Sequence, residues 1–201
     1  MESIFFISFA VAVGFIVFFC VASNNTARKI QAKETQVKEE GDAKKLEARK
    51  RLTEEYEFSV AGVTFGSRQK KLRTVADYDL KFKSDSDVMG SIAYILKREP
   101  DNKHDPNAIA VFVEVEYSKE KANGDYGESK YKNIGMIGYV PAEDAKEIAP
   151  KMDAGYVVWV QSGRINEFYA EALQDDILAV KLDVSVEPSR EMIKDAIAGG
   201  I

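Results

Sequence analysis

The sequence predicts a mainly β domain with short helices, placed after a single transmembrane helix and a charged helical stalk. Residues 4–22 are almost wholly apolar and carry no charge, and the segment that follows is rich in Lys, Arg, Glu and Ala. From residue 56 onward, short strand-like runs alternate with turn residues. The expected divisions are a transmembrane helix at 1–22, a charged helical linker at 23–55, a β domain at 56–187 and a short C-terminal helix or tail at 188–201.

The apolar run from Ile4 to Ala22 has the length of a membrane span. Its 19 residues would extend about 28 Å as a helix, close to the thickness of a bilayer's hydrocarbon core. A cleaved signal peptide is the alternative, but Glu2 stands where such a peptide carries positive charge, and the run exceeds the usual apolar length of roughly 7–15 residues. Arg28 and Lys29 follow the span, so the positive-inside rule predicts a single-pass membrane protein with its N-terminus outside and its C-terminal domain in the cytoplasm.

The segment from Ala27 to about Glu55 favours a helix. It is rich in strong helix formers and contains no proline. Its apolar residues keep no steady heptad spacing, which does not support a long coiled coil, although a dimerising stalk is the alternative. Gly41 and Asp42 are expected to interrupt the helix. We therefore expect a semi-rigid helical linker between the bilayer and the β domain.

The first half of the β domain contains three expected strands. The first, at 57–65, includes Gly62, which allows another backbone to approach closely. A polar and basic stretch at 67–75 follows and is expected to form a short helix or turn. Strands at 88–98 and 108–117 then flank a turn that is rich in Asp and Asn.

The second half of the β domain begins with a long, charged segment at 118–133, which contains Asn123-Gly124 and is expected to be an exposed hairpin tip. A strand at 134–140 follows. Pro141 suits the first turn of a helix, which should end or kink near Pro150. The remaining expected elements are two closing strands at 156–169 and 177–186 and a short terminal helix at 191–198.

The turn between the second and third expected strands has the densest set of short polar side chains. Pro100 lacks a backbone donor and ends the strand before it. The strand after the turn, at 108–113, is apolar on both faces and is expected to be fully buried. Side chains that bond nearby backbone favour turns, and four of them occur here: Asp101, Asn102, Asp105 and Asn107. Loops of this kind between core strands often carry function.

Two runs, REPDNKHDPNAIAV at 98–111 and IGMIGYVP at 134–141, resemble the HIRAN domain. Val60–Val63 and Arg68-Gln69 add to the resemblance, which covers roughly residues 57 to 160. This family includes stand-alone bacterial and phage proteins and the N-terminal domains of eukaryotic DNA-repair helicases. The resemblance implies a small OB-like β-barrel with short helices and a site that holds single-stranded DNA at its 3′ end.

The resemblance also implies which residues would bind nucleic acid. Phe65 matches an aromatic residue that stacks on a base, although it could instead pack in the core. Asn102 and Asp105 match polar turn residues that meet the terminal nucleotide, and their alternative role is to cap the turn. His104 stands where relatives usually have tyrosine, and Tyr139 occupies an exposed aromatic position. The expected binding residues are Phe65, Arg68, Asn102, His104, Asp105 and Tyr139, with weaker phosphate contacts from Lys70, Lys71 and Arg73.

Three departures from the family pattern keep a second function open. Gly66 follows Phe65 where relatives have a paired aromatic residue, and Pro141 and Ala142 stand where eukaryotic relatives carry basic residues. The net charge of −5 is also unlike that of a protein that coats DNA. The sequence thus supports a membrane-anchored cytoplasmic module that binds single-stranded DNA or a 3′ DNA end. The alternative is a membrane-tethered protein-interaction module that has lost DNA binding.

Catalytic and cofactor-binding motifs are absent from the sequence. His104 is the only histidine and Cys20 the only cysteine, so neither an imidazole-rich metal site nor a Cys-x-x-Cys site can form. No phosphate-binding loop of the form G-x-x-x-x-G-K-[ST] occurs. We therefore expect no enzyme activity, no metal and no cofactor. The expected partners are single-stranded DNA or a 3′ DNA end, the lipid bilayer through residues 4–22 and, in the alternative function, a protein.

Overall fold

The computed structural model describes residues 33–121, 124–170 and 175–200. The chain divides into two compact units, whose described parts are residues 33–50 with 194–200 and residues 51–121, 124–170 and 175–193. The predicted transmembrane helix at 1–22 lies outside the described residues. Within the described residues, no helix is long and apolar enough to cross a bilayer.

Residues 33–52 form one continuous helix. Gly41 and Asp42 lie inside this helix, so the predicted interruption was wrong. The residues around them are strong helix formers, and one glycine in a helix costs only about 1 kcal/mol relative to alanine. Asp42 also pairs with Lys45 at 3.0 Å along the helix surface. The last helix, α4 (Arg190–Ala198), begins one residue before the predicted start.

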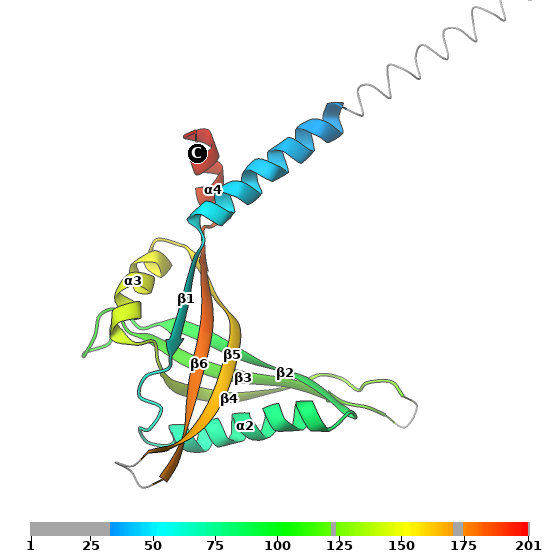
Figure 1. Ribbon diagram of the computed structural model, residues 1–201, viewed down its shortest axis with the longest axis vertical. Coiled ribbons are helices and arrows are strands. Elements are labelled where there is room, and N and C mark those ends of the chain that lie inside the picture. Colours follow the sequence, from blue (N-terminus) through cyan, green and yellow to red (C-terminus); the bar gives the residue numbers. More distant parts are fainter. Residues whose placement is uncertain (1–32, 122–123, 171–174, 201) are drawn as a thin grey trace, which may run out of the picture. The chain divides into compact units, whose positions relative to one another are not determined.

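The larger unit contains two antiparallel sheets of three strands each, in the orders β1-β6-β5 and β2-β3-β4 (Figure 1). The six strands are β1 (Glu54–Ser59), β2 (Val88–Arg98), β3 (Ile109–Lys119), β4 (Lys130–Tyr139), β5 (Val157–Ala170) and β6 (Asp175–Glu187). Two further helices are α2 (Arg68–Ser84) and α3 (Ala142–Asp153). The predicted mainly β fold with short helices is confirmed, with different bounds for several elements.

The two sheets are joined by backbone hydrogen bonds at residues 60 and 61. Val60 donates its N–H to the carbonyl of Val180 on β6 at 2.8 Å. Ala61 and Tyr139 exchange two hydrogen bonds, at 2.8 and 3.0 Å, and this short bridge links the chain after β1 to the end of β4. The segment that follows β1 therefore belongs to both sheets.

The opposite sides of the sheets, at β2 and β5, meet through side chains. The ring of Tyr94 on β2 lies against Gly163 on β5, where an added Cβ would be only 2.2 Å from a ring atom. No β2–β5 ladder occurs among the described strands, and a hollow of 510 Å³ opens beside the ring. The OB-like β-barrel expected from the resemblance is therefore not closed, since β2 and β5 meet at the Tyr94 ring without a ladder.

The core fills the space between the sheets and the two helices that cover them. The strand at 108–113 is buried as predicted, apart from the half-buried Phe112. The largest fully buried side chains are Leu72, Ile109, Ile137, Ile148, Leu182, Val75, Val111, Val113, Val115, Val180, Val184 and Val186. They come from α2, α3 and both sheets, so one apolar core supports the whole unit.

Helix α2 is longer than the short helix or turn predicted at 67–75. Leu72 and Val75 are buried, and the half-buried Tyr78 and Phe82 continue the same face at a spacing of three and four residues. Tyr78 contacts the ring of Tyr117 on β3, with 5.6 Å between ring centroids. The aromatic half of α2 is thus held by the sheet β2-β3-β4. This contact could not be predicted from the local sequence pattern.

Helix α3 includes Pro150 and ends three residues later, at Asp153, near the predicted end. Lys151 in its last turn bonds the carboxylate of Glu54 and the hydroxyl of Tyr56, the latter at 2.7 Å. The hydrogen bond from Lys151 lowers the pKa of Glu54. These contacts attach the end of α3 to β1 at the start of the β domain.

Candidate functional site

The chain between β1 and α2 forms a tight turn over the end of β4. Gly62 and Gly66 adopt φ values of 70° and 59°, which favour glycine. Phe65 donates its N–H to the Gly62 carbonyl at 3.2 Å, and its ring lies against Gly62. The Phe65 side chain is nevertheless 70% exposed. The core-packing alternative for this residue is therefore excluded, and its aromatic face is available to a ligand.

Arg68, the first residue of α2, brings a cation to the same turn. Its Nη1 donates to the Gly62 carbonyl at 2.7 Å. The guanidinium lies 5.4 Å from the centre of the Tyr139 ring, within the range of a cation–π contact. Because Ala61 bonds the backbone of Tyr139, the ring and the guanidinium are both held by the turn. Phe65, Arg68 and Tyr139 thus come together at one place on the surface.

The Tyr139 hydroxyl connects this turn to the polar loop between β2 and β3. It donates to Glu99 Oε2 at 3.3 Å, and the Asn102 side-chain amide donates to the same oxygen at 3.0 Å. The sequence prediction missed Glu99, although it stands inside the REPDN run directly before Pro100. Arg68, Tyr139, Glu99 and Asn102 form a chain of contacts, which we call the Tyr139 cluster.

The polar loop is also capped by its own side chains. Asn102 Oδ1 accepts the N–H groups of His104 and Asp105, at 3.0 and 3.3 Å. Asp105 Oδ1 accepts the N–H of Asn107 at 2.8 Å. The capping role considered for Asn102 and Asp105 is therefore confirmed. Asn102 has a second contact that joins it to the Tyr139 cluster, whereas Asp105 bonds within the loop alone as far as the described residues go.

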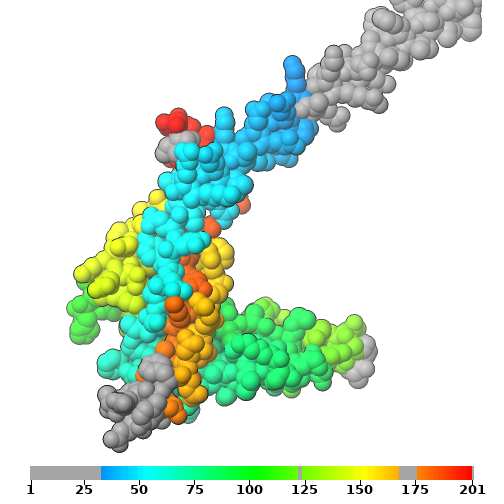
Figure 2. All heavy atoms as spheres, in the orientation of Figure 1, coloured from blue at the N-terminus to red at the C-terminus, as the bar shows by residue number. Residues whose placement is uncertain are grey.

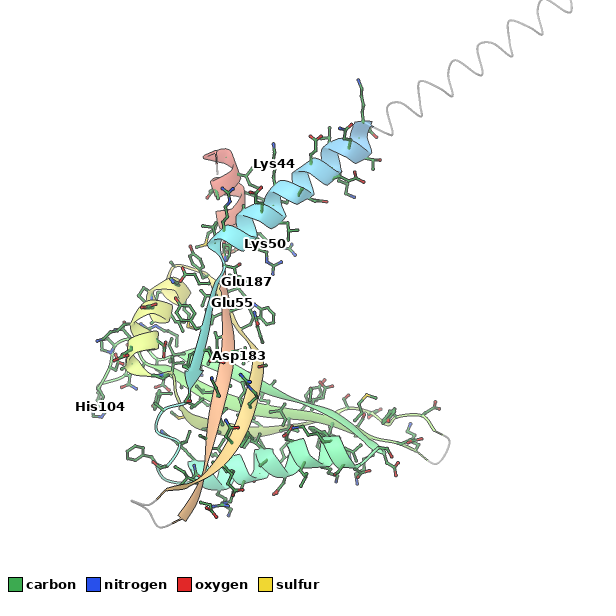
Figure 3. The ribbon with its side chains drawn as sticks, viewed as in Figure 1. Lys44, Lys50, Glu55, His104, Asp183 and Glu187 are labelled. Atoms are coloured by element: carbon green, nitrogen blue, oxygen red, sulfur yellow. The ribbon has the colours of Figure 1, made fainter. Side chains whose placement is uncertain are left out.

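His104 lies at the exposed tip of this loop, where its side chain points away from the domain (Figure 3). Within the described part of the chain, no hydrogen bond or ion pair joins its imidazole to the Tyr139 cluster. The two neighbours that surround it in sequence, Lys103 and Asp105, are exposed and half-buried respectively. The structure therefore places His104 beside the cluster in sequence without joining it to the cluster.

The three cations predicted to contact phosphates occupy different surroundings. Lys71 Nζ donates to the Met136 carbonyl of β4 at 3.0 Å, so its charge lies next to the cluster. Lys70 is exposed. Arg73 donates to the Asp176 carbonyl on β6 at 3.0 Å. Arg73 therefore connects α2 to the sheet β1-β6-β5. The structure does not bring Arg73 together with the predicted binding residues.

Gln69 holds the beginning of α2 in place and was not among the predicted site residues. Its Nε2 donates to the carbonyls of Val63 and Leu178, at 3.2 and 2.9 Å, and its Oε1 accepts the Leu178 N–H at 2.9 Å. These bonds fix the turn that carries Phe65 and Arg68 against β6. In the sequence, the only feature that pointed to Gln69 was its place in the Arg68-Gln69 pair of the family resemblance.

The arrangement is suited to binding. An exposed ring can stack on a flat ligand, Arg68 and Lys71 supply positive charge, and the Glu99 carboxylate can accept a hydrogen bond from a hydroxyl group. Among the residues that the structure describes, no group of three His, Cys, Asp or Glu side chains is placed to hold a metal ion.

A sequence profile of the family described as "HIRAN domain" matches residues 54–187. These limits coincide with the first residue of β1 and the last residue of β6. The match therefore covers both sheets, α2, α3 and the whole Tyr139 cluster. Comparison with curated proteins and with solved structures finds no match.

Proposed function

The chain belongs to the HIRAN domain family, and on this basis we propose that its β domain binds single-stranded DNA at a 3′ end through the Tyr139 cluster and Phe65. The observation that carries this proposal is the meeting of an exposed aromatic ring, a cation and a hydrogen-bonded carboxylate on one surface. These are the groups needed for a terminal base, a phosphate and a sugar hydroxyl. The domain acts as a binding module, without a chemical step.

Each residue has a distinct role in this proposal. Phe65 stacks on a base, because its ring is exposed and is held against Gly62. Arg68 and Lys71 contact the nearest phosphates. The Glu99 carboxylate accepts a hydrogen bond from the terminal 3′-hydroxyl, and the Asn102 side-chain amide lies beside it as a donor. A 3′-phosphate would bring negative charge toward the Glu99 carboxylate and should bind more weakly.

The net charge of −5 does not oppose recognition of a strand end. Proteins that coat nucleic acid need many phosphate contacts, which a basic surface supplies. A strand end instead requires one stacking platform and a few polar groups. The proposal therefore depends on the local charges of the site more than on the charge of the whole chain.

Phe65→Ala tests the proposal directly. Removing one stacked base is expected to cost about 1–3 kcal/mol, or roughly five- to 150-fold in affinity. The measurement is the fluorescence anisotropy of labelled oligonucleotides titrated with the full-length chain in a nonionic detergent. Oligonucleotides that end in a 3′-hydroxyl should bind more tightly than those that end in a 3′-phosphate.

Leu80→Ala is the matched control, since Leu80 is an apolar residue of α2 that is 67% exposed, similar to Phe65. This variant should bind as the wild type does. Equal affinity for both kinds of 3′ end, together with no effect of Phe65→Ala, would contradict the proposal.

The second candidate function is a protein-interaction module that has lost DNA binding. The specific observations in its favour are Gly66 in place of a paired aromatic residue, and Pro141 and Ala142 in place of basic residues. If the wild-type chain binds no oligonucleotide at low salt, this candidate replaces the first.

We further propose that the domain is held at the cytoplasmic face of a membrane by a single span at Ile4–Ala22. The uncharged apolar run and the downstream Arg28-Lys29 support this proposal. The helix at 33–52 would then be part of the link between the span and the β domain.

A further inference from the structure

The β3–β4 hairpin separates its charges by face. The register pairs Lys130 with Tyr117 and Lys132 with Val115, and Lys119 follows two residues after Tyr117. Because side chains alternate along a strand, these three lysines share the face of the buried Val115. Glu114 and Glu116 point to the opposite face, where Glu116 accepts a hydrogen bond from Tyr131 at 2.8 Å.

A hollow of 390 Å³ lies on the lysine face of the hairpin. Its lining contains three amines and one carboxylate, and the lining residues are Tyr117, Lys119, Lys121, Gly127, Glu128 and Lys130. No ion pair to Lys119, Lys121 or Lys130 occurs among the described residues. The amines are thus available to an anion. We call Lys132, Lys130, Lys119 and Lys121 the lysine track.

The lysine track lies on the same side of β4 as α2, whose Lys71 is next to the Tyr139 cluster. Lys71 lies against Met136, and Lys132 lies over the Tyr78 ring of α2, at 5.2 Å from its centre. Strand β4 connects the two regions, since it runs from Lys130 to Tyr139. At about 3.3 Å per residue, this strand spans about 30 Å.

The hairpin of β3 and β4 extends past the C-terminal end of α2 (Figures 1 and 2). Tyr117, whose ring contacts Tyr78 of α2, is one of the residues that line the hollow. Alternating cations and aromatic rings form the type of surface on which single strands lie.

We propose that the lysine track binds the phosphates of a single strand whose 3′ end is held at the Tyr139 cluster. The inference rests on the proposed function and adds the path of the strand away from its end. A span of about 30 Å is too long for one small anion, and it suits the site sizes of about 4–16 nucleotides known for OB-type single-strand binders. Glu114 and Glu116 lie on the other face of the hairpin, so they do not oppose phosphates that lie on the lysine track.

The dependence of affinity on strand length tests this path. The full-length chain in nonionic detergent is titrated with 3′-hydroxyl oligonucleotides of about four and about twelve nucleotides, limits taken from the same range of site sizes. The short strand reports on the Tyr139 cluster alone, whereas the long strand also reaches the lysine track. The triple variant Lys119→Gln, Lys130→Gln, Lys132→Gln should bind the short strand as the wild type does and should bind the long strand more weakly.

The salt dependence gives the size of the effect. Each phosphate contact on a single strand contributes about 0.7 to the slope of log affinity against log salt, so losing three contacts should lower the slope by about 2. Between about 50 and 200 mM salt, the wild type should therefore lose about twentyfold more affinity for the long strand than the variant loses.

A charge-matched control replaces Lys83, Lys97 and Lys146 with Gln. Lys83 pairs with Asp79, Lys97 lies over Phe112 on the far face of its sheet, and Lys146 is exposed on α3. This control should keep the wild-type slope. Thermal melts of both triple variants test whether they remain folded.

An unchanged slope in the lysine-track variant would overturn the inference, and intact binding of the short strand would leave the proposed function standing. Loss of binding to anionic vesicles, with oligonucleotide affinity retained, would assign the lysine track to lipid and would also overturn it. If Phe65→Ala has no effect while the slope falls as expected, the lysine track stands and the strand-end function fails.

Discussion

Tyr139 is the residue on which most contacts of the candidate site converge. Its backbone pairs with Ala61, its ring receives the Arg68 guanidinium, and its hydroxyl donates to Glu99. Replacing it would therefore disturb the turn, the cation and the polar loop together. Phe65 is the better residue for a binding test, because its exposed ring can be removed without changing these contacts.

Local chemistry accounts for the part of the site that the sequence predicted. Asn102 and Asp105 cap a turn through bonds to residues only two or three positions away, and the sequence contains all of these partners. The contact between Arg68 and Tyr139 joins residues far apart in the chain, and Glu99 gains its role only when Tyr139 reaches it. Such contacts depend on the tertiary fold and could not be derived from spacing.

Tyr94 should make the stability of the domain depend on pH in the alkaline range. Burial, and to a lesser degree the Asp79 carboxylate, raises the pKa of Tyr94 to about 12 from an ordinary value of 10.0. In that interval the unfolded chain releases the tyrosine proton while the folded chain keeps it. The free energy of unfolding should therefore fall as pH rises from 10 to 12, by up to about 3 kcal/mol.

Urea unfolding of the wild type and of Tyr94→Phe across this interval measures the effect. The phenylalanine variant keeps a ring against Gly163 and has no proton to lose, so it should show a smaller decline. The same decline in both proteins would assign the pH dependence to another group.

Strand β2 and helix α2 show what element bounds can be predicted from a sequence. The prediction for β2, at 88–98, agrees with the structure because Pro100 and a cluster of turn residues end the strand locally. The prediction for α2 ended at residue 75, whereas the helix continues to Ser84. Its second half is held by the contact between Tyr78 and Tyr117, which comes from tertiary packing.

The open side between β2 and β5 depends on a glycine. Gly163→Ala should lower the free energy of unfolding by about 1–3 kcal/mol, because the new methyl group would overlap the ring of Tyr94 and force the two strands apart. Urea denaturation of the full-length chain provides the measurement.

Gly127→Ala is the control for this substitution. Its added methyl would lie 3.4 Å from the nearest backbone oxygen, which requires only a small adjustment, and a change within about 0.5 kcal/mol is expected at such a surface position. An equal loss in the free energy of unfolding in the two variants would show that the contact with Tyr94 does not determine the effect at position 163.

At the scale of the whole molecule, the proposed membrane anchor makes a testable prediction. The full-length chain should sediment with membranes and resist extraction by carbonate and by high salt, because about 19 apolar residues are enough to span a bilayer. Protease added to intact cells should leave the β domain uncut. A chain that lacks residues 1–22 serves as the control and should remain in the supernatant.

A shortened, soluble form that begins near Ser23 would instead show that the apolar run is a signal peptide. The fractionation experiment therefore distinguishes a retained anchor from a cleaved signal peptide.

The pairing of the first strand with the last has a consequence for how the domain forms during synthesis. Strand β1 pairs with β6 from Glu54 opposite Val186, so β1 leaves the ribosome long before its partner exists. The sheet β2-β3-β4 is continuous in the chain and can assemble earlier, since its contacts are local.

The turn that carries Phe65 and Arg68 depends on the late strand. Val60 and Gln69, on either side of that turn, both bond to β6, at Val180 and Leu178. A nascent chain that ends before β6 thus contains the complete polar loop with Asn102 but lacks the support that holds Phe65 over the end of β4. Only a chain translated through its last strand can present the assembled surface, which makes ligand binding a property of finished molecules.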